Sequence, residues 1–235
     1  GEPPLGETWE VAPGVRWLRM PLPFKLDHIN LWMLEDGDGW TLVDTGINTE
    51  ETRDAWDRVF ETTLAGKPVT RIIVTHFHPD HVGLAGWLAA RFKVPLWMPY
   101  TEWATGRMLS FETRESAGPV SHAFYKAAGF SGERLDQVER RVGRYGGNIS
   151  AIPAAIRRIA HGDEFAVGAH SWRVIEGNGH SPEHACLYCA DLGVLISGDQ
   201  ILPKISPNVS VWPQEPEADP LARFLDSLKR FKDLP

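Results

Sequence analysis

The stretch that decides the fold of this protein reads THFHPDHVG at residues 75–83. It places three histidines and one aspartate within six residues, at His76, His78, Asp80 and His81. A strand is predicted just before it, at 71–74, so these side chains begin where a buried strand ends. Ligand sites in α/β sheets lie outside the carboxyl ends of the strands. We therefore expect a functional site at this turn.

The spacing of these side chains indicates a metal site. In an extended chain alternate side chains share one face, so His76 and His78 can bind one ion together. Asp80 and His81 start a helix predicted at 82–92 and project to a neighbouring point. Imidazole nitrogens and carboxylate oxygens at this density are typical ligands of zinc, iron or manganese. The alternative is a polar helix start in which Asp80 only caps the helix.

Three further polar residues stand at the ends of predicted strands. His180 follows a strand at 172–176, Asp199 follows one at 194–197, and Asp44 ends one at 40–44. Glycines beside His180 and Asp199 permit tight turns. We expect His180 to complete a set of three histidines, Asp199 to bridge two ions, and Asp44 to orient a ligand histidine from behind. The alternatives are a loop histidine and two aspartates that only cap turns.

The rest of the sequence predicts a single domain over residues 1–235 with a helical insertion. Strands are expected at 15–20 and 29–35, a helix at 49–64, and a parallel pair of strands at 71–74 and 94–98. The insertion, at about residues 100–160, has helical periodicity at 121–128, 133–144 and 149–159. Strands return at 164–167, 172–176, 185–190 and 194–197, and an amphipathic helix is expected at 219–231.

The composition narrows the class of protein. Apolar residues make up 43% of the chain, charged residues make up 23%, and the formal net charge is −7. The acidic balance disfavours a nucleic-acid binder, because phosphates require a basic surface. No apolar run reaches the roughly 18 residues of a membrane span, and two cysteines provide no disulfide framework. We expect a cytoplasmic protein with a small-molecule substrate; the sequence does not indicate an oligomeric state.

These motifs resemble those of the metallo-β-lactamase-fold hydrolases. The resemblance rests on Asp44-Thr45-Gly46, the 76–83 motif, Gly179-His180-Ser181 and Gly198-Asp199, in that order. It implies an α/β (α+β) fold, an αββα four-layer sandwich of two mixed sheets with outer helices. Carried over residue by residue, the resemblance implies His76, His78 and His180 as ligands of a first metal. It also implies Asp80 and His81 as ligands of a second metal and Asp199 as the bridge.

The same resemblance implies an activity. The presence of both Asp80 and Asp199 is similar to the ligand pattern of the glyoxalase II, lactonase and ribonuclease branches of the family. It implies one or two zinc ions, with iron or manganese as alternatives, and a metal-held hydroxide that attacks an ester, thioester or lactone carbonyl. Asp80, His81 and Asp199 are then the catalytic residues. Two alternatives stay open: a non-heme iron oxygenase similar to the persulfide dioxygenases, and a scaffold that binds metal without turnover.

One feature departs from the family pattern. The family normally supplies a further histidine to the second metal, after a strand that follows the last helix. This sequence ends at Pro235, about where that strand would begin. We therefore expect the C-terminal part of the domain to be missing.

Substrate contacts are harder to locate from sequence. His184 and Lys204 lie near the predicted ligands along the chain and are candidates. His28 is a third candidate, because the family resemblance implies that loops ahead of the metal carry substrate contacts. Residues 131–160 contain six arginines against three acidic residues, a local balance that opposes the net charge of the chain. This pattern indicates either an ordinary solvated helix surface or a rim that attracts an anionic substrate.

Overall fold

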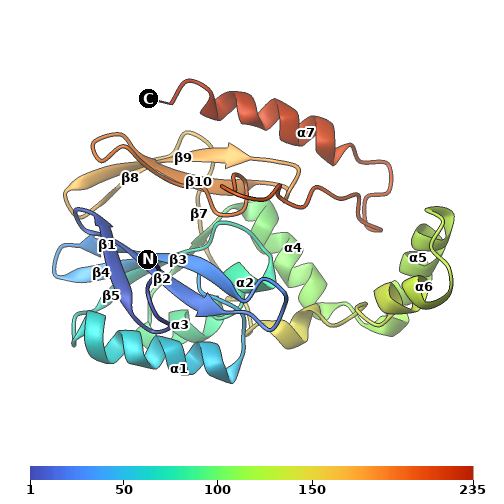
Figure 1. Ribbon diagram of the computed structural model, residues 1–235, viewed down its shortest axis with the longest axis horizontal. Coiled ribbons are helices and arrows are strands. Elements are labelled where there is room, and N and C mark those ends of the chain that lie inside the picture. Colours follow the sequence, from blue (N-terminus) through green and yellow to red (C-terminus); the bar gives the residue numbers. More distant parts are fainter. Residues whose placement is uncertain (235) are drawn as a thin grey trace.

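Two β-sheets form the centre of the computed structural model, which describes residues 1–234 (Figure 1). The first sheet has seven strands in chain order: β1 (Thr8–Ala12), β2 (Val15–Pro21), β3 (His28–Asp36), β4 (Gly39–Val43), β5 (Val69–Ile73), β6 (Leu96–Met98) and β7 (Arg157–Arg158). The second sheet has the order β11-β10-β9-β8, built from β8 (Glu164–Val167), β9 (His170–Gly177), β10 (His184–Cys189) and β11 (Val194–Ile196).

Helices cover the outer faces of both sheets. Figure 1 shows α1 and α3 against the first sheet and α7 over the second, so the predicted αββα order of layers is confirmed. No helix of the described residues is long and apolar enough to span a membrane. The helices are α1 (Glu50–Val59), α2 (Pro79–Val82), α3 (Ala85–Phe92), α4 (Tyr100–Phe111), α5 (Arg114–Ala127), α6 (Gly132–Glu139) and α7 (Pro220–Ser227).

Strand direction brings several strand ends to one edge. In the first sheet β1 to β4 are antiparallel, and β4, β5, β6 and β7 are parallel to one another. The second sheet is antiparallel throughout, so only the first of the two sheets is mixed as expected. Because β9 and β11 both run opposite to β10, they also share a direction. The turns that follow β4 and β5, and those that follow β9 and β11, can therefore meet.

Alternating side chains on the central strands build two cores. Leu42 and Ile72 face the core under α1 and α3, whereas their neighbours Val43 and Ile73 face the core between the sheets. All four are fully buried. Burying one such side chain stabilises the fold by roughly 1.5–3 kcal/mol, so β4 and β5 are held firmly on both faces.

Helix α1 begins where the sequence predicts a helix. Thr49 accepts a hydrogen bond from the Thr52 amide and caps α1, as the sequence predicts for a helix over 49–64. The helix ends in a π-helical turn at Phe60–Leu64. Ala55 and Trp56 are fully buried on its inner face.

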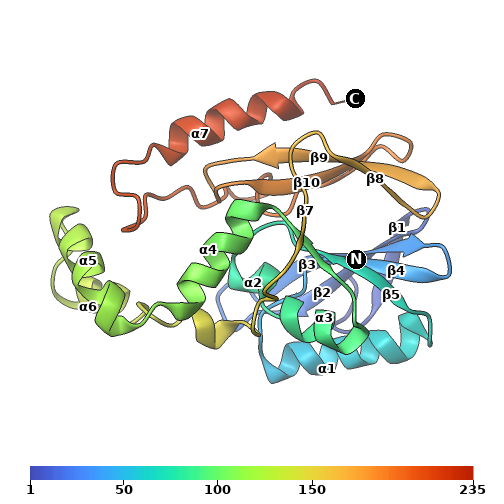
Figure 2. The ribbon, with the colours of Figure 1, turned by 180° about the vertical axis from the view of Figure 1, so that it is seen from behind.

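The insertion differs from its prediction at 149–159. This segment is extended rather than helical and ends in the short strand β7. Its isoleucines serve different cores: Ile149 and Ile152 are buried under the first sheet, and Ile159 is buried between the sheets. The spacing that resembled a helical period therefore reflects packing of an extended chain. Figures 1 and 2 both show α5 and α6 lying away from the sheets.

Candidate metal centre

Three histidines meet where the two sheets come together. His76 Nε2 lies 3.0 Å from His78 Nδ1, which lies 3.0 Å from His180 Nε2, and His180 Nε2 lies 3.2 Å from His76 Nε2. His76 and His78 follow β5, and His180 follows β9. The structure thus brings together three of the predicted ligands from strand ends in different sheets.

A second group lies beside the three histidines. One ligand atom each from Asp80, His81 and Asp199 falls within 4.8 Å of the others, and Asp199 also belongs to the histidine group by the same measure. Asp199 Oδ1 lies 3.4 Å from His81 Nε2, and its Oδ2 lies 3.6 Å from His180 Nε2. The aspartate that the sequence places after the last strand therefore lies between the two groups.

Burial keeps the first group neutral. Desolvation, together with the neighbouring imidazoles, lowers the pKa of His78 to about 3 and that of His76 well below its usual value. Burial also lowers the pKa of His180. A neutral imidazole nitrogen has a free lone pair, and three of them that point at one another repel unless they share a cation.

The second group has the opposite electrostatics. Burial alone would lower the pKa of His81, but the carboxylates of Asp199, Asp44 and Asp80 raise it well above its usual value. Although burial opposes ionisation of Asp199, His81 holds the pKa of that carboxyl below its usual range. Burial raises the pKa of Asp80.

This donor set fits a divalent transition metal. His81 Nε2 is buried and has no hydrogen-bond partner among the described residues, although it faces two carboxylates. In the first group His76 Nε2, His78 Nδ1 and His180 Nε2 lie within hydrogen-bond distance only of one another among the described residues. Imidazole and carboxylate donors in two adjoining sets are the ligands that zinc, iron and manganese accept in proteins. A cation between them would satisfy the orphaned nitrogen and relieve the crowding of lone pairs.

Asp44 supports the ligands from behind, in the place that the sequence suggests. Its carboxylate accepts a hydrogen bond from the Thr75 amide at 2.8 Å and lies 2.8 Å from His81 Nδ1. Thr75 Oγ1 also donates to Asp44 and lies 2.9 Å from His76 Nδ1. Such bonds fix the tautomer and the orientation of ligand imidazoles. Asp44 has a left-handed backbone with φ of 63°, a conformation that costs energy and is held by these contacts.

Glycine is required where the ligand turns approach their neighbours. Gly198 has φ of +50°, and a Cβ there would lie 2.6 Å from His184 Cε1. Gly179 has φ of +90°, and a Cβ there would lie 2.4 Å from the Pro220 carbonyl oxygen. A side chain at either position would push Asp199 or His180 out of place.

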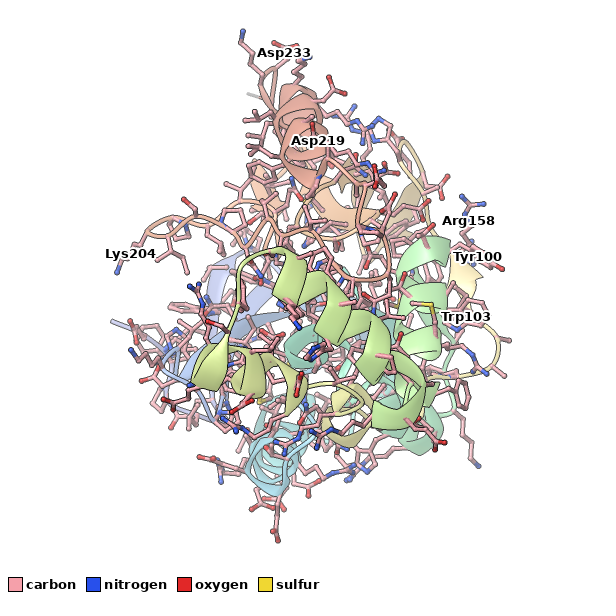
Figure 3. The ribbon with its side chains drawn as sticks, turned by 90° about the vertical axis from the view of Figure 1, so that its right-hand side faces the viewer. Tyr100, Trp103, Arg158, Lys204, Asp219 and Asp233 are labelled. Atoms are coloured by element: carbon pink, nitrogen blue, oxygen red, sulfur yellow. The ribbon has the colours of Figure 1, made fainter. Side chains whose placement is uncertain are left out.

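The three candidate substrate residues lie outside the cavity that adjoins the metal centre. His184 is fully buried behind the ligands, where its Nε2 accepts a hydrogen bond from the Asp199 amide at 3.1 Å. His28, at the start of β3, bonds to Arg19 and Asp27. Lys204 lies on an exposed loop that extends from the body of the protein (Figure 3). None of the three lines the cavity.

Glu102 joins the two ligand turns and was not expected from the sequence. This residue of α4 is fully buried, and burial raises its pKa to about 7. Its carboxylate accepts hydrogen bonds from the Phe77 amide at 3.0 Å, from Ser181 Oγ at 2.7 Å and from the Glu183 amide at 2.6 Å. A single glutamate in a helix carries no sequence signal for such a role.

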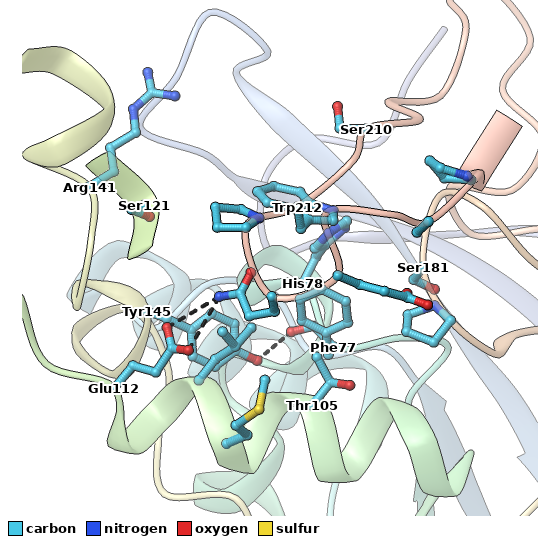
Figure 4. Close-up of a pocket in the computed structure, with 18 of the residues that line it drawn as sticks. Phe77, His78, Thr105, Glu112, Ser121, Arg141, Tyr145, Ser181, Ser210 and Trp212 are labelled. Carbon is cyan, nitrogen blue, oxygen red and sulfur yellow. Dashed lines mark hydrogen bonds between the residues drawn. The ribbon is translucent and has the colours of Figure 1, made fainter. Parts of the chain in front are cut away.

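A cavity of about 470 Å³ opens beside the first group of ligands. His78 and His180 are among its lining residues, α4 to α6 contribute one wall, and the segment at 210–223 contributes another. Figure 4 shows Arg141 and His78 well apart, with Arg141 at the upper left, His78 beside Trp212 near the centre, and Glu112 at the lower left. Cavities of this size accommodate small molecules.

Comparison with known proteins agrees with this geometry. The chain is 46% identical to a beta-lactamase domain protein from Burkholderia ambifaria, with a TM-score of 0.87, and the match covers all of this chain and 70% of that one. It is 24% identical over 225 residues to the "Probable metallo-hydrolase YqjP" of Bacillus subtilis (strain 168), covering 92% of this chain and 67% of that protein. It is 26% identical over 139 residues to the hydroxyacylglutathione hydrolase of Rhizobium etli, covering 59% of this chain and 36% of that protein.

The family assignment follows from a match over nearly the whole chain. The sequence model of the metallo-beta-lactamase superfamily matches residues 25–235, which include Asp44 and every predicted ligand. The chain belongs to the metallo-beta-lactamase superfamily.

Proposed function

We propose that this protein is a hydrolase that holds one or two zinc ions and cleaves an ester, thioester or lactone. The observation that carries the proposal is the meeting of His76, His78 and His180 with Asp199 as a shared neighbour of Asp80 and His81. The similarity to a hydroxyacylglutathione hydrolase, which acts on a thioester, supports the choice of carbonyl substrates.

Each residue has a role that its position supports. His76, His78 and His180 would hold the first ion, His81 and Asp80 the second, and Asp199 would contact both. When bound, such ions polarise a carbonyl and lower the pKa of water to about 7. Asp80 lies at the border of this group with a side chain 23% exposed, so it can orient a water molecule and accept its proton.

An anionic substrate is part of the proposal. Two arginines line the cavity, but Arg223 forms an ion pair with Glu215 at 2.9 Å. Arg141 has no ion pair among the described residues, and it comes from the arginine-rich part of the insertion. Replacing Arg141 by Gln should raise KM for anionic substrates about tenfold and leave KM for neutral ones unchanged. Arg140→Gln is the matched control, because Arg140 lies next to Arg141 and outside the cavity lining.

The first experiment determines the metal and the reaction together. The protein is purified, analysed for bound metals, stripped with a chelator and reloaded separately with zinc, iron and manganese. Each form is then assayed on a panel of esters, thioesters and lactones. We expect two or fewer equivalents of metal and the highest hydrolysis with zinc.

Two variants make the experiment decisive. His78→Ala should lose metal and hydrolysis, whereas His161→Ala, at a surface histidine outside both groups, should keep both. Hydrolysis that is unchanged in His78→Ala would overturn the proposal. Iron with oxygen consumption in place of hydrolysis would favour an oxygenase of the same superfamily. Full metal loading with no turnover of any kind would favour a binding scaffold.

A further inference from the structure

We propose that the cavity beside the metal centre binds an apolar group of the substrate, so that the protein prefers hydrophobic esters or thioesters to polar ones such as glutathione thioesters. This inference rests on the proposed function and specifies its substrate class. His78 and His180 line the cavity, so a carbonyl held at the first group of ligands can extend one of its substituents into it.

The walls of the cavity are mostly hydrocarbon. They come from three parts of the chain: the outer half of α4, the ends of α5 and α6, and the segment around 212. The apolar side chains that form them include Met108, Leu109, Val138, Val142, Trp212 and Pro213. Binding to a surface of this kind is most favourable for an apolar group and least favourable for a hydrated peptide.

Two of these apolar side chains are exposed to water, which is unfavourable, and a bound apolar group would cover them. Met108 is 47% exposed and Trp212 is 43% exposed, although both are large and apolar. Neither belongs to a core cluster of the described residues. Contiguous exposed apolar surface inside a concavity is typical of ligand sites rather than of ordinary protein surface.

Polar groups on the walls are largely engaged with one another. Glu112 accepts hydrogen bonds from Gln214 at 3.2 and 3.4 Å, which join the end of α4 to the opposite wall. Glu215 pairs with Arg223. Tyr145 donates its hydroxyl to the Phe77 carbonyl (Figure 4). Arg141 can meet one carboxylate of a substrate, but these contacts leave few other free donors and acceptors to recognise the amides of a peptidic substrate.

The test varies the length of the apolar group. With metal-loaded protein, kcat/KM is measured for 4-nitrophenyl acetate, butyrate and hexanoate, for methyl and hexyl esters of one acid, and for S-lactoylglutathione as the polar thioester. Each buried methylene should contribute about three- to fourfold, so hexanoate should exceed acetate on the order of 100-fold. S-Lactoylglutathione should be the poorest substrate.

Variants of the wall locate the effect. Trp212→Ala should lower kcat/KM for hexanoate about tenfold and for acetate less than about twofold, and Trp212→Phe should restore most of the loss. Met108→Gln should flatten the dependence on chain length. Phe111→Gln is its matched control, because Phe111 is an exposed apolar residue of the same helix outside the cavity lining. Circular dichroism and thermal unfolding show whether each variant is folded.

A binding measurement separates recognition from chemistry. Octanoate titrated into metal-free protein should bind with a negative heat-capacity change that Trp212→Ala reduces. A flat dependence on chain length in both ester series, unaffected by Trp212→Ala, would overturn this inference while the hydrolase proposal stands. Absence of turnover for every ester and thioester with metal bound would overturn the hydrolase proposal instead.

Discussion

The metal centre and the insertion are built in opposite ways. His76 and His81 are fully buried, and the segment that carries them follows β5, which is packed on both faces. By contrast, α6 buries none of its side chains, and α5 buries only Ser121. The metal centre is therefore fixed by both cores, whereas the outer part of the insertion has little packing of its own.

This difference assigns separate tasks to the two regions. Ligands must be held within a fraction of an ångström, and the strand ends provide that precision. Side chains in the walls of a substrate cavity can be replaced without unfolding the protein, because the hydrophobic cores depend little on them. Glu102 is the exception, since it belongs to the insertion and yet bonds to both ligand turns.

The sharpest way to break the comparison is to remove one ligand. His78→Ala should abolish metal binding at the first group and lower hydrolysis by about 10³-fold or more, because chemistry and binding both depend on that ion. Metal content and kcat are the measurements. Residual activity above about one tenth of wild type would contradict this prediction.

A second test concerns the link between the regions. Glu102→Ala should weaken metal affinity about 10- to 100-fold, since it frees three donors that hold the ligand turns in place. Competition with a chromophoric chelator measures this affinity. Glu102→Gln should recover part of the loss, because its amide oxygen can still accept hydrogen bonds. Glu115→Gln, at an exposed glutamate of α5, should match wild type.

The third test compares stability in the two regions. Leu187 of β10 is fully buried between the sheets, so Leu187→Ala should lower the free energy of unfolding by about 2–5 kcal/mol. Leu135 of α6 is only partly buried, so Leu135→Ala should cost less than about 1 kcal/mol. Denaturant unfolding at constant m-value measures both. Equal costs would show that the insertion is packed as firmly as the sheets.

The smallest expected effect is a dependence of stability on pH. Burial raises the pKa of Glu102 to about 7, so in the metal-free protein the folded state keeps a proton that the unfolded state has already lost. Stability should therefore fall as the pH rises from about 4.5 to 7, by at most about 3 kcal/mol. Glu102→Gln should lack this component when urea unfolding is measured at several pH values. An identical pH dependence in wild type and variant would contradict the prediction.

The sequence predicted the regions that follow local rules. For the 75–83 motif and the helix predicted at 49–64, residue spacing and apolar periodicity indicate the same local structure. The ligands could be proposed because strand ends of one direction share an edge, which holds for any sheet of this kind. The αββα fold class was implied by the family resemblance that these motifs carry, and the predicted order of strands and helices agreed with it.

The remainder depends on tertiary contacts that leave no local trace. The isoleucines at 149–159 have helical spacing, yet each packs into a core from an extended chain. Glu102 is an ordinary helix residue until α4 docks against two turns about 25 and 80 positions away. Lys204 was proposed from its place along the chain and His28 from the family resemblance, and neither residue lines the cavity.

The distance along the chain between the ligands has a consequence for synthesis and folding. His76 and His180 meet although 104 positions separate them. A nascent chain that has completed β5 contains the ligands at 76–81 but not His180, the third histidine of the first group. Its affinity for metal rises only when the second sheet has formed and docked. We expect metal capture to be a late event that reports completed folding. A substitution that slows pairing of β9 with β10 would then lower metal content in the cell without touching a ligand.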